Sequence, residues 1–224
     1  MIFLSIIGQR FADAGLHDIL VESGLTGSNA VSSVLSGKHY NRAMRVHQVV
    51  MEALFRLLWR SFEQWLSEEE ALGQILSARL KNALECFRQE FRQESCHALK
   101  SSPDFNALYQ AFCQFCASLQ SPVAKLWLSY LCMVQLLLSY THSIRAADWH
   151  LHLLTVRKIL PWVFAYDHTY YCRSLSVYWC EMKALPTTHI EVDNQLRNGQ
   201  FCVQRGQSHF GQVSLDQVIK QSIK

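Results

Sequence analysis

One pair of neighbouring residues combines groups that could do acid–base chemistry. Asp167 and His168 lie within residues 161–179, the most densely aromatic stretch of the chain. A carboxylate can orient an imidazole for proton transfer, and neighbours such as Tyr170, Tyr171 and Arg173 could assist. Alternatively, Asp167 caps a helix beside a kink, and the aromatic side chains fill the core. Because adjacent helical residues point about 100° apart, the pair need not act together, and we favour the structural interpretation.

Two cysteines have the spacing of zinc and redox motifs. Cys113 and Cys116 form a C-x-x-C pattern between phenylalanines, in the middle of a predicted helix. A structural zinc site needs a second ligand pair, and Cys96-His97 belongs to a different predicted element. A redox motif would follow a strand rather than lie mid-helix. We therefore expect buried free thiols here.

The histidines form no ligand set that the sequence can support. His150 and His152 are two residues apart, so they point to different faces of a helix. His47 falls on the apolar face of its predicted helix, which favours a core histidine over a ligand. The chain also has no Gly-rich phosphate loop, Gly-x-Ser-x-Gly elbow or His-Glu-x-x-His motif. We predict no catalytic, cofactor-binding or metal-binding residue and no small-molecule substrate, and we lean against an enzyme.

Composition indicates an ordered protein with little electrostatic specialisation. Of 224 residues, 50% are hydrophobic and 17% charged, and the formal net charge is +3. Charges of both signs are interspersed, so DNA binding is neither supported nor excluded. Lys38, Arg42 and Arg45 form a modest basic edge that could meet phosphate, although a solvated helix face explains it equally well. Eight cysteines, mostly in helical patterns, favour reduced, mostly buried thiols in the cytosol or nucleus.

Periodicity and capping residues predict helices across the first two thirds of the chain. An amphipathic stripe covers residues 38–66, and Gly37 fits the C′ position of the short run before it. Ser67 begins a capping box for a helix to about residue 95. Two Ser-Pro pairs, 102–103 and 121–122, predict helices at about 103–119 and 122–145.

The helix predicted for 122–145 is apolar on all sides and nearly long enough to cross a membrane. Lys125 and Gln135 interrupt it, and we see no second span. Both facts favour the buried central helix of a soluble bundle, without membrane contact.

The last third has further start and stop residues. Asp148 is a predicted cap, Pro161 predicts a kink or break, and Asp167 is expected to cap a helix that Pro186 stops near Leu185. A capping box at 188–191, a stop at Gly199, a strand at 201–204 and a final helix capped by Ser214 complete the pattern.

These elements predict a mainly α fold: an irregular multi-helix bundle with one or two short peripheral strands. We expect one domain over residues 1–224. It comprises a mixed segment 1–37, a helical core 38–185 and a strand-and-helix appendage 186–224. The apolar residues 1–8 lack the basic start of a signal peptide, so we expect a short buried strand or helix that begins inside a larger ancestral domain.

Four segments of the sequence carry a family resemblance: residues 11–24, 37–47, 162–168 and 198–204. The chain resembles a multicopy, uncharacterised family of animal proteins derived from mobile elements, related to transposase-like domains of unknown function in fungi. The resemblance implies the helical insertion of a truncated RNase H-like domain. In such a core three carboxylates hold two metal ions, and the first would lie upstream of residue 1.

The resemblance also weighs against activity. The pattern that ends the related sequences corresponds to residues 216–221 of this chain. Lys220 stands where that pattern has a glutamate, and a lysine would repel a metal ion. We therefore expect an uncharacterised, non-catalytic, transposon-derived fragment that at most binds protein partners, inside the cell, in the cytoplasm or nucleus. The alternatives are a residual DNA-binding, nuclease or transposase function, and a helical adaptor unrelated to DNA.

Overall fold

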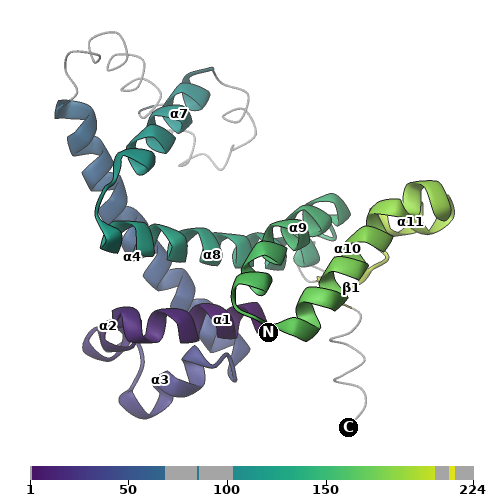
Figure 1. Ribbon diagram of the computed structural model, residues 1–224, viewed down its shortest axis with the longest axis horizontal. Coiled ribbons are helices and arrows are strands. Elements are labelled where there is room, and N and C mark those ends of the chain that lie inside the picture. The colour runs from purple at the N-terminus through teal and green to yellow at the C-terminus, as the bar shows by residue number, and fades with distance from the viewer. Residues whose placement is uncertain (1, 69–84, 86–102, 205–211, 215–224) are drawn as a thin grey trace. The chain divides into compact units, whose positions relative to one another are not determined.

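The computed structural model describes residues 2–68, 85, 103–204 and 212–214 (Figure 1). These residues are mainly helical and include one two-stranded sheet, which confirms the predicted fold class. They divide into two compact units, Met1–Gln48 with Cys132–Lys224 and, separately, Val49–Leu131. The boundaries expected at residues 37 and 185 stay predictions.

The first unit begins with short helices around an apolar core (Figure 1). The N-terminal run is a buried helix that packs so closely on α3 that a Cβ on Gly8 would lie 2.0 Å from the Leu35 carbonyl oxygen. Gly37 ends α3 at a φ of 73°, and its N–H donates to the Val34 carbonyl, which confirms its C′ role. The elements are α1 (Ile2–Phe11), the π-helical η1 (Ala12–Leu16), α2 (His17–Glu22) and α3 (Ser28–Leu35).

The next helices confirm three predicted ranges. They are α4 (Tyr40–Glu68), α7 (Pro103–Ser118) and α8 (Pro122–Arg145). At the start of α8 the Ser121 hydroxyl accepts the Ala124 N–H at 3.4 Å, as a cap does. Ser67 instead lies inside the last turn of α4, and its hydroxyl donates to the Gln64 carbonyl. The helix expected at about 67–95 lies outside the described residues.

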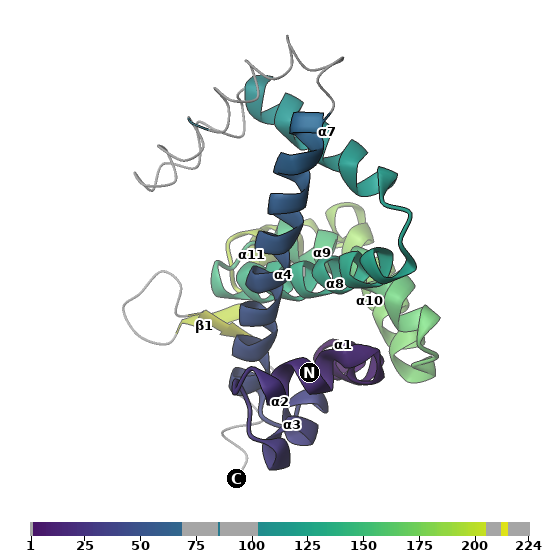
Figure 2. The ribbon, with the colours of Figure 1, turned by 90° about the vertical axis from the view of Figure 1, so that its left-hand side faces the viewer.

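The second unit is held together by aromatic packing between α4 and α7 (Figure 2). Phe62 is fully buried at its centre, 5.2 Å from the ring of Phe112 and 5.6 Å from that of Phe115. These rings come from residues three or four apart on each helix, so one apolar face of α4 meets one face of α7.

The prediction that α8 is buried on all sides is wrong. By length and composition α8 could cross a membrane, yet only 22% of its most apolar stretch is buried. Its buried residues Tyr130, Met133, Val134 and Leu137 recur at helical spacing, whereas Val123 is 63% exposed. Packing therefore covers one face of α8, and the rest of its apolar surface is more open than a central helix would be.

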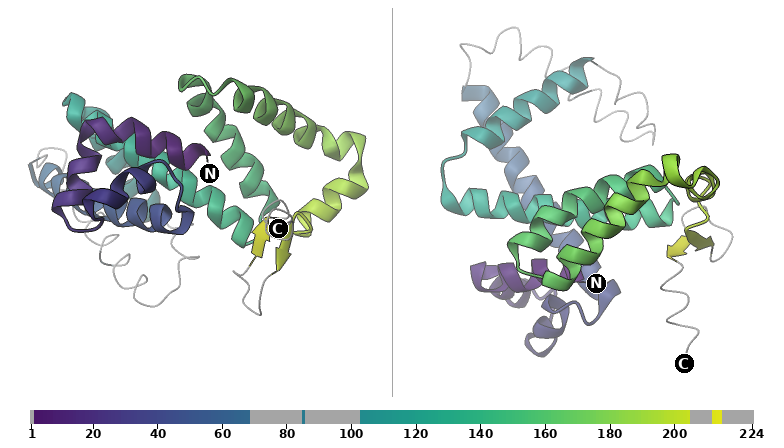
Figure 3. Two further views of the ribbon diagram at one scale, coloured as in Figure 1. Left: turned by 90° about the horizontal axis from the view of Figure 1, so that it is seen from below. Right: turned by 45° about the vertical axis from the view of Figure 1, so that its right-hand side comes forward.

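The first unit continues with α9 (Trp149–Ala165), and α10 (Thr169–Thr188) packs beside it (Figure 3). Asp148 caps α9 as predicted, because its carboxylate accepts the Leu151 N–H at 2.9 Å. Of the kink or break predicted at Pro161, the break is absent, because α9 continues to Ala165. Buried side chains on both sides of the proline, Ile159 and Val163, hold the helix against the lost hydrogen bond.

The end of the described chain departs from the predicted caps. Pro186 lies inside α10 rather than stopping it, next to the buried Leu185. No side chain caps α11 (Ile190–Arg197), and the Thr188 hydroxyl donates back to the Ala184 carbonyl, so the predicted capping box is wrong. Gly199 ends α11 at a φ of 86°, as expected.

The predicted strand is present as β1 (Cys202–Gln204), paired antiparallel with β2 (Gln212–Ser214). Cys202 pairs with Ser214, so this serine lies in a strand. The helix expected after it lies outside the described residues.

Candidate functional site

The Asp167-His168 pair lies at the sharp bend between α9 and α10. Asp167 is exposed and has a φ of 52°, in the left-handed region. Its N–H donates to the Phe164 carbonyl and that of His168 to the Val163 carbonyl, which is the hydrogen-bond pattern of a Schellman helix end. The predicted cap is therefore wrong: Asp167 closes α9, and α10 begins after His168 without a side-chain cap.

The bend does not assemble an acid–base site from the predicted residues. Within the described chain, no hydrogen bond joins the Asp167 carboxylate to the His168 imidazole. Tyr170 is 88% exposed and Tyr171 44% exposed, so the expectation that these rings fill the core of the bend is wrong.

The cluster of perturbed side chains is centred instead on His152. Its imidazole stacks on Trp149 with ring centroids 5.5 Å apart and approaches Phe201 at 5.4 Å. The ring centroid of Tyr140 lies 5.3 Å from that of His152, and the Tyr178 hydroxyl and His152 Nε2 share a hydrogen bond of 3.1 Å. We call Tyr140, Trp149, His152, Tyr178 and Phe201 the inner cluster; it joins α8, α9, α10 and the segment before β1.

Burial dominates the electrostatics of the inner cluster. His152 is 7% exposed, and desolvation lowers its pKa to about 4, so the imidazole is neutral at pH 7. Burial also raises the pKa of Tyr178 above its usual range and that of the Cys202 thiol to about 11. Cys202 Sγ donates to the Ile144 carbonyl at 3.2 Å. All these groups are held in their neutral forms.

Two polar atoms of the inner cluster have no hydrogen-bond partner among the described residues: Trp149 Nε1 and His152 Nδ1. Leaving such atoms unpaired costs about 1–3 kcal/mol each. His152 is nearly closed to solvent, so the cluster acts as a structural hub. One signal in the sequence could have pointed to His152: it follows Trp149 by three residues, a spacing that brings two side chains together on a helix.

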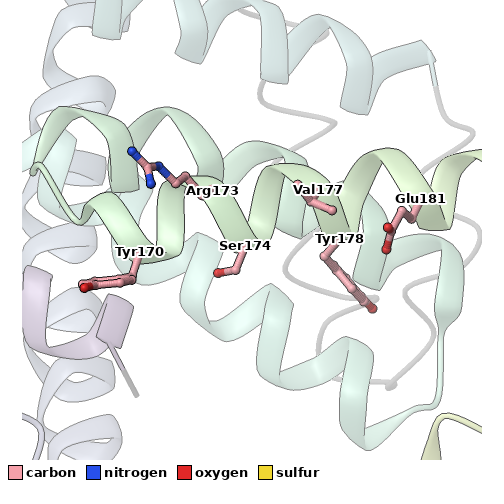
Figure 4. Close-up of a pocket in the computed structure, with 6 residues that line it drawn as sticks. All are labelled: Tyr170, Arg173, Ser174, Val177, Tyr178 and Glu181. Carbon is pink, nitrogen blue, oxygen red and sulfur yellow. The ribbon is translucent and has the colours of Figure 1, made fainter.

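A second feature of α10 is an open hollow of about 450 Å³ that begins beside Tyr178 of the inner cluster. Figure 4 shows the six lining side chains, all from α10. Tyr178 also reaches the inner cluster, whereas the other five are exposed. These five, which we call the outer face, are Tyr170, Arg173, Ser174, Val177 and Glu181. Sequence reasoning singled out Tyr170 and Arg173 as neighbours of the Asp167-His168 pair and not as members of one face of α10.

The described cysteines are free thiols, as predicted, but they are not mostly buried. Cys113, Cys132 and Cys180 are exposed, and only Cys172 is buried among the six in the described ranges. Cys113 points away from the aromatic core between α4 and α7, while Cys116 packs against it. Residues three apart on a helix point about 60° away from one another. The Cys116 thiol therefore packs against the core, whereas the Cys113 thiol is exposed to solvent.

The remaining predicted site residues are separate from one another. His47 is buried as expected, and desolvation lowers its pKa to about 4, whereas His150 is exposed. No group of three or more His, Cys, Asp or Glu residues in the described part of the chain could hold a metal ion. Cys96-His97 and residues 216–221 lie outside the described residues.

Comparison with known proteins identifies a family without a described activity. The model of the family "Domain of unknown function (DUF8702)" matches residues 1–224, so the chain belongs to this family. No curated protein and no solved structure matches the chain.

Proposed function

We propose that this chain is a non-catalytic helical domain that binds other proteins through the outer face of α10. The observation that carries the proposal is the exposure of large side chains there: Tyr170 is 88% and Val177 55% exposed. Arg173 and Glu181 add one charge of each sign to the same face, and the described residues make no ion pair with either.

The shape of the hollow favours a macromolecule over a small ligand. Small-molecule sites enclose most of the ligand's surface, within walls drawn from several elements. This hollow is open and is lined by one helix. Exposed tyrosine and arginine side chains are common anchors of protein interfaces, because they supply contact area together with a polar group.

We further propose a transposase-like, mobile-element origin for the chain, supported by the resemblance of its four segments. An intracellular location, in the cytoplasm or nucleus, is supported by the exposed free thiols Cys113, Cys132 and Cys180. Such thiols persist in reducing compartments.

Site-specific photocrosslinking in cells tests the binding proposal. A photoreactive phenylalanine in place of Tyr170 should give a discrete protein adduct that reducing agents do not remove. The same residue in place of Val192, 42% exposed on α11, is the matched control and should give no such adduct. An identical adduct pattern at both positions, or none at either, would contradict binding through the outer face.

DNA binding is a second candidate because Lys38, Arg42 and Arg45 are all exposed, at spacings of four and three residues. Three phosphate contacts would give a log–log slope of affinity against salt of about −2.7 on duplex DNA. Replacing the three residues by Ala should abolish that slope if they bind DNA. Binding that keeps its slope, or none at any salt concentration, would reject this edge as a DNA site.

A further inference from the structure

We propose that Cys113 and Cys116 of α7 form a binding site for one Cu(I) ion, held between their two thiolates. The pair lies on a different helix from the outer face, so this inference goes beyond the proposed protein-binding function. Three features of the pair carry it. Both cysteines are free thiols, solvent reaches both of them, and their spacing on a helix suits a metal ion better than a disulfide.

The spacing of the pair follows from the geometry of α7. Cys113 and Cys116 are three residues apart within this helix, so their Cβ atoms lie about 5–6 Å apart. A disulfide needs Cβ atoms about 3.5–4.5 Å apart, which is closer than a helix sets them at this spacing. A metal ion with one sulfur about 2.3 Å away on either side sets the two sulfur atoms about 4.6 Å apart. Rotation about the two Cα–Cβ bonds can reach that separation while the backbone of α7 stays in place.

The two cysteines differ in their surroundings. Cys113 is exposed, and the Tyr109 hydroxyl, one turn earlier, donates a hydrogen bond to its sulfur, which raises the pKa of Tyr109. Cys116 is half-buried against the aromatic core of the second unit, which includes Phe62 and Phe115. An ion can therefore enter from solvent at Cys113. Tyr109 then acts as an outer donor that orients the thiolate, and the aromatic side keeps water from the ion.

The number and type of the ligands select the metal ion. Thiolates are soft ligands and favour soft ions such as Cu(I), which accepts two ligands in a linear arrangement. Structural Zn²⁺ takes four ligands, and the described residues group no third His, Cys, Asp or Glu with this pair. On binding, each thiol releases its proton to solvent and each sulfur forms one bond to copper. Copper stays in the +1 state, so no oxidant or reductant takes part.

Competition for Cu(I) between the full chain and a chromophoric copper chelator, without oxygen and at pH 7, tests the site. Cys113→Ser should weaken the tightest binding of Cu(I) by about a hundredfold or more, because the second sulfur acts as an intramolecular ligand. Cys116→Ser should give the same loss, and the double variant no further loss, since either change breaks the pair. Cys132→Ser is the matched control. It removes an exposed thiol that has no cysteine three or four residues away, so it should leave the affinity unchanged.

The exposed position of Cys113 keeps the test decisive even if Cys116→Ser disturbs the aromatic core. X-ray absorption by the bound copper should show two sulfur neighbours in a linear arrangement. An affinity that Cys113→Ser leaves unchanged overturns the site, as does an equal loss from Cys132→Ser or a copper ion with three or four sulfur neighbours. None of these results bears on protein binding through the outer face, which photocrosslinking tests separately.

Discussion

The inner cluster and the outer face adjoin one another at Tyr178 of α10, and they differ in how far solvent reaches them. The inner cluster holds the groups with displaced pKa values, His152, Tyr178 and Cys202, and these are wholly or partly buried. The outer face holds exposed rings and charges, Tyr170, Arg173 and Glu181. A catalytic site needs perturbed groups and access in one place, whereas a recognition surface needs only access and shape. This difference in access supports the proposal that the outer face serves recognition.

The largest expected contrast is in stability. Trp149→Ala should lower the free energy of unfolding by about 3–5 kcal/mol, because it leaves a cavity beside His152 and Phe201. Tyr170→Ala should change it by less than about 0.5 kcal/mol, because the ring is 88% exposed. Chemical denaturation at pH 7 measures both. Similar losses in the two variants would contradict the division into a buried cluster and a free face.

Acidification should lower stability through two buried histidines. His47 and His152 have folded pKa values of about 4, against about 6.5 in the unfolded chain. Below pH 6.5 these histidines bind protons in the unfolded chain but not in the folded chain. The free energy of unfolding therefore decreases as the pH falls, until the folded pKa is reached near pH 4.

Between pH 7 and pH 5 this loss should be about 2 kcal/mol for each histidine. Denaturation curves at the two pH values measure it, and His152→Gln should reduce the loss by about half. A pH dependence that His152→Gln leaves untouched would show that this histidine is not desolvated.

A smaller effect is expected from the hydrogen bond between Tyr178 and His152. Tyr178→Phe keeps the ring but removes the partner of Nε2, which should cost about 1–2 kcal/mol. Tyr171→Phe removes a hydroxyl from an exposed tyrosine of the same helix and should cost almost nothing. Equal melting temperatures for the two variants would mean that the hydrogen bond does not stabilise the fold.

The smallest expected effect is a gain at the bend. Asp167→Gly should raise the free energy of unfolding by about 0.5–1 kcal/mol, because glycine adopts the left-handed conformation without a Cβ penalty. Asp167→Ala should lose stability whichever role Asp167 has, because alanine is strained in the left-handed region, so the sign of the glycine effect is decisive. A loss of stability from Asp167→Gly would restore Asp167 as a helix cap.

Local chemistry made much of the fold predictable. Pro122 and Asp148 mark helix starts, and Gly37 and Gly199 mark helix ends, because each residue has one conformation or hydrogen bond that suits that position. Ala147 and Asp167 occupy the same left-handed C′ position without being glycine, so their residue types did not predict the helix ends there. Pro161 does not end α9, since the helix continues to Ala165 with Ile159 and Val163 buried on either side of the proline.

The site was less predictable because its contacts are distant in sequence. His152 meets Tyr178 from 26 residues away and Phe201 from the segment before β1, and no local pattern specifies those meetings. The outer face was visible in part, since Tyr170 and Arg173 stood out. Which side of α10 faces solvent depends on how α10 packs against α9, and periodicity alone did not decide it.

Photocrosslinking from the outer face tests the proposed binding most directly. A photoreactive phenylalanine at position 170 should give a discrete protein adduct in cells, because the native Tyr170 side chain is 88% exposed. The same residue at position 192 on α11, the matched control, should give none. Equal adducts from the two positions, or no adduct from position 170, would contradict binding through the outer face.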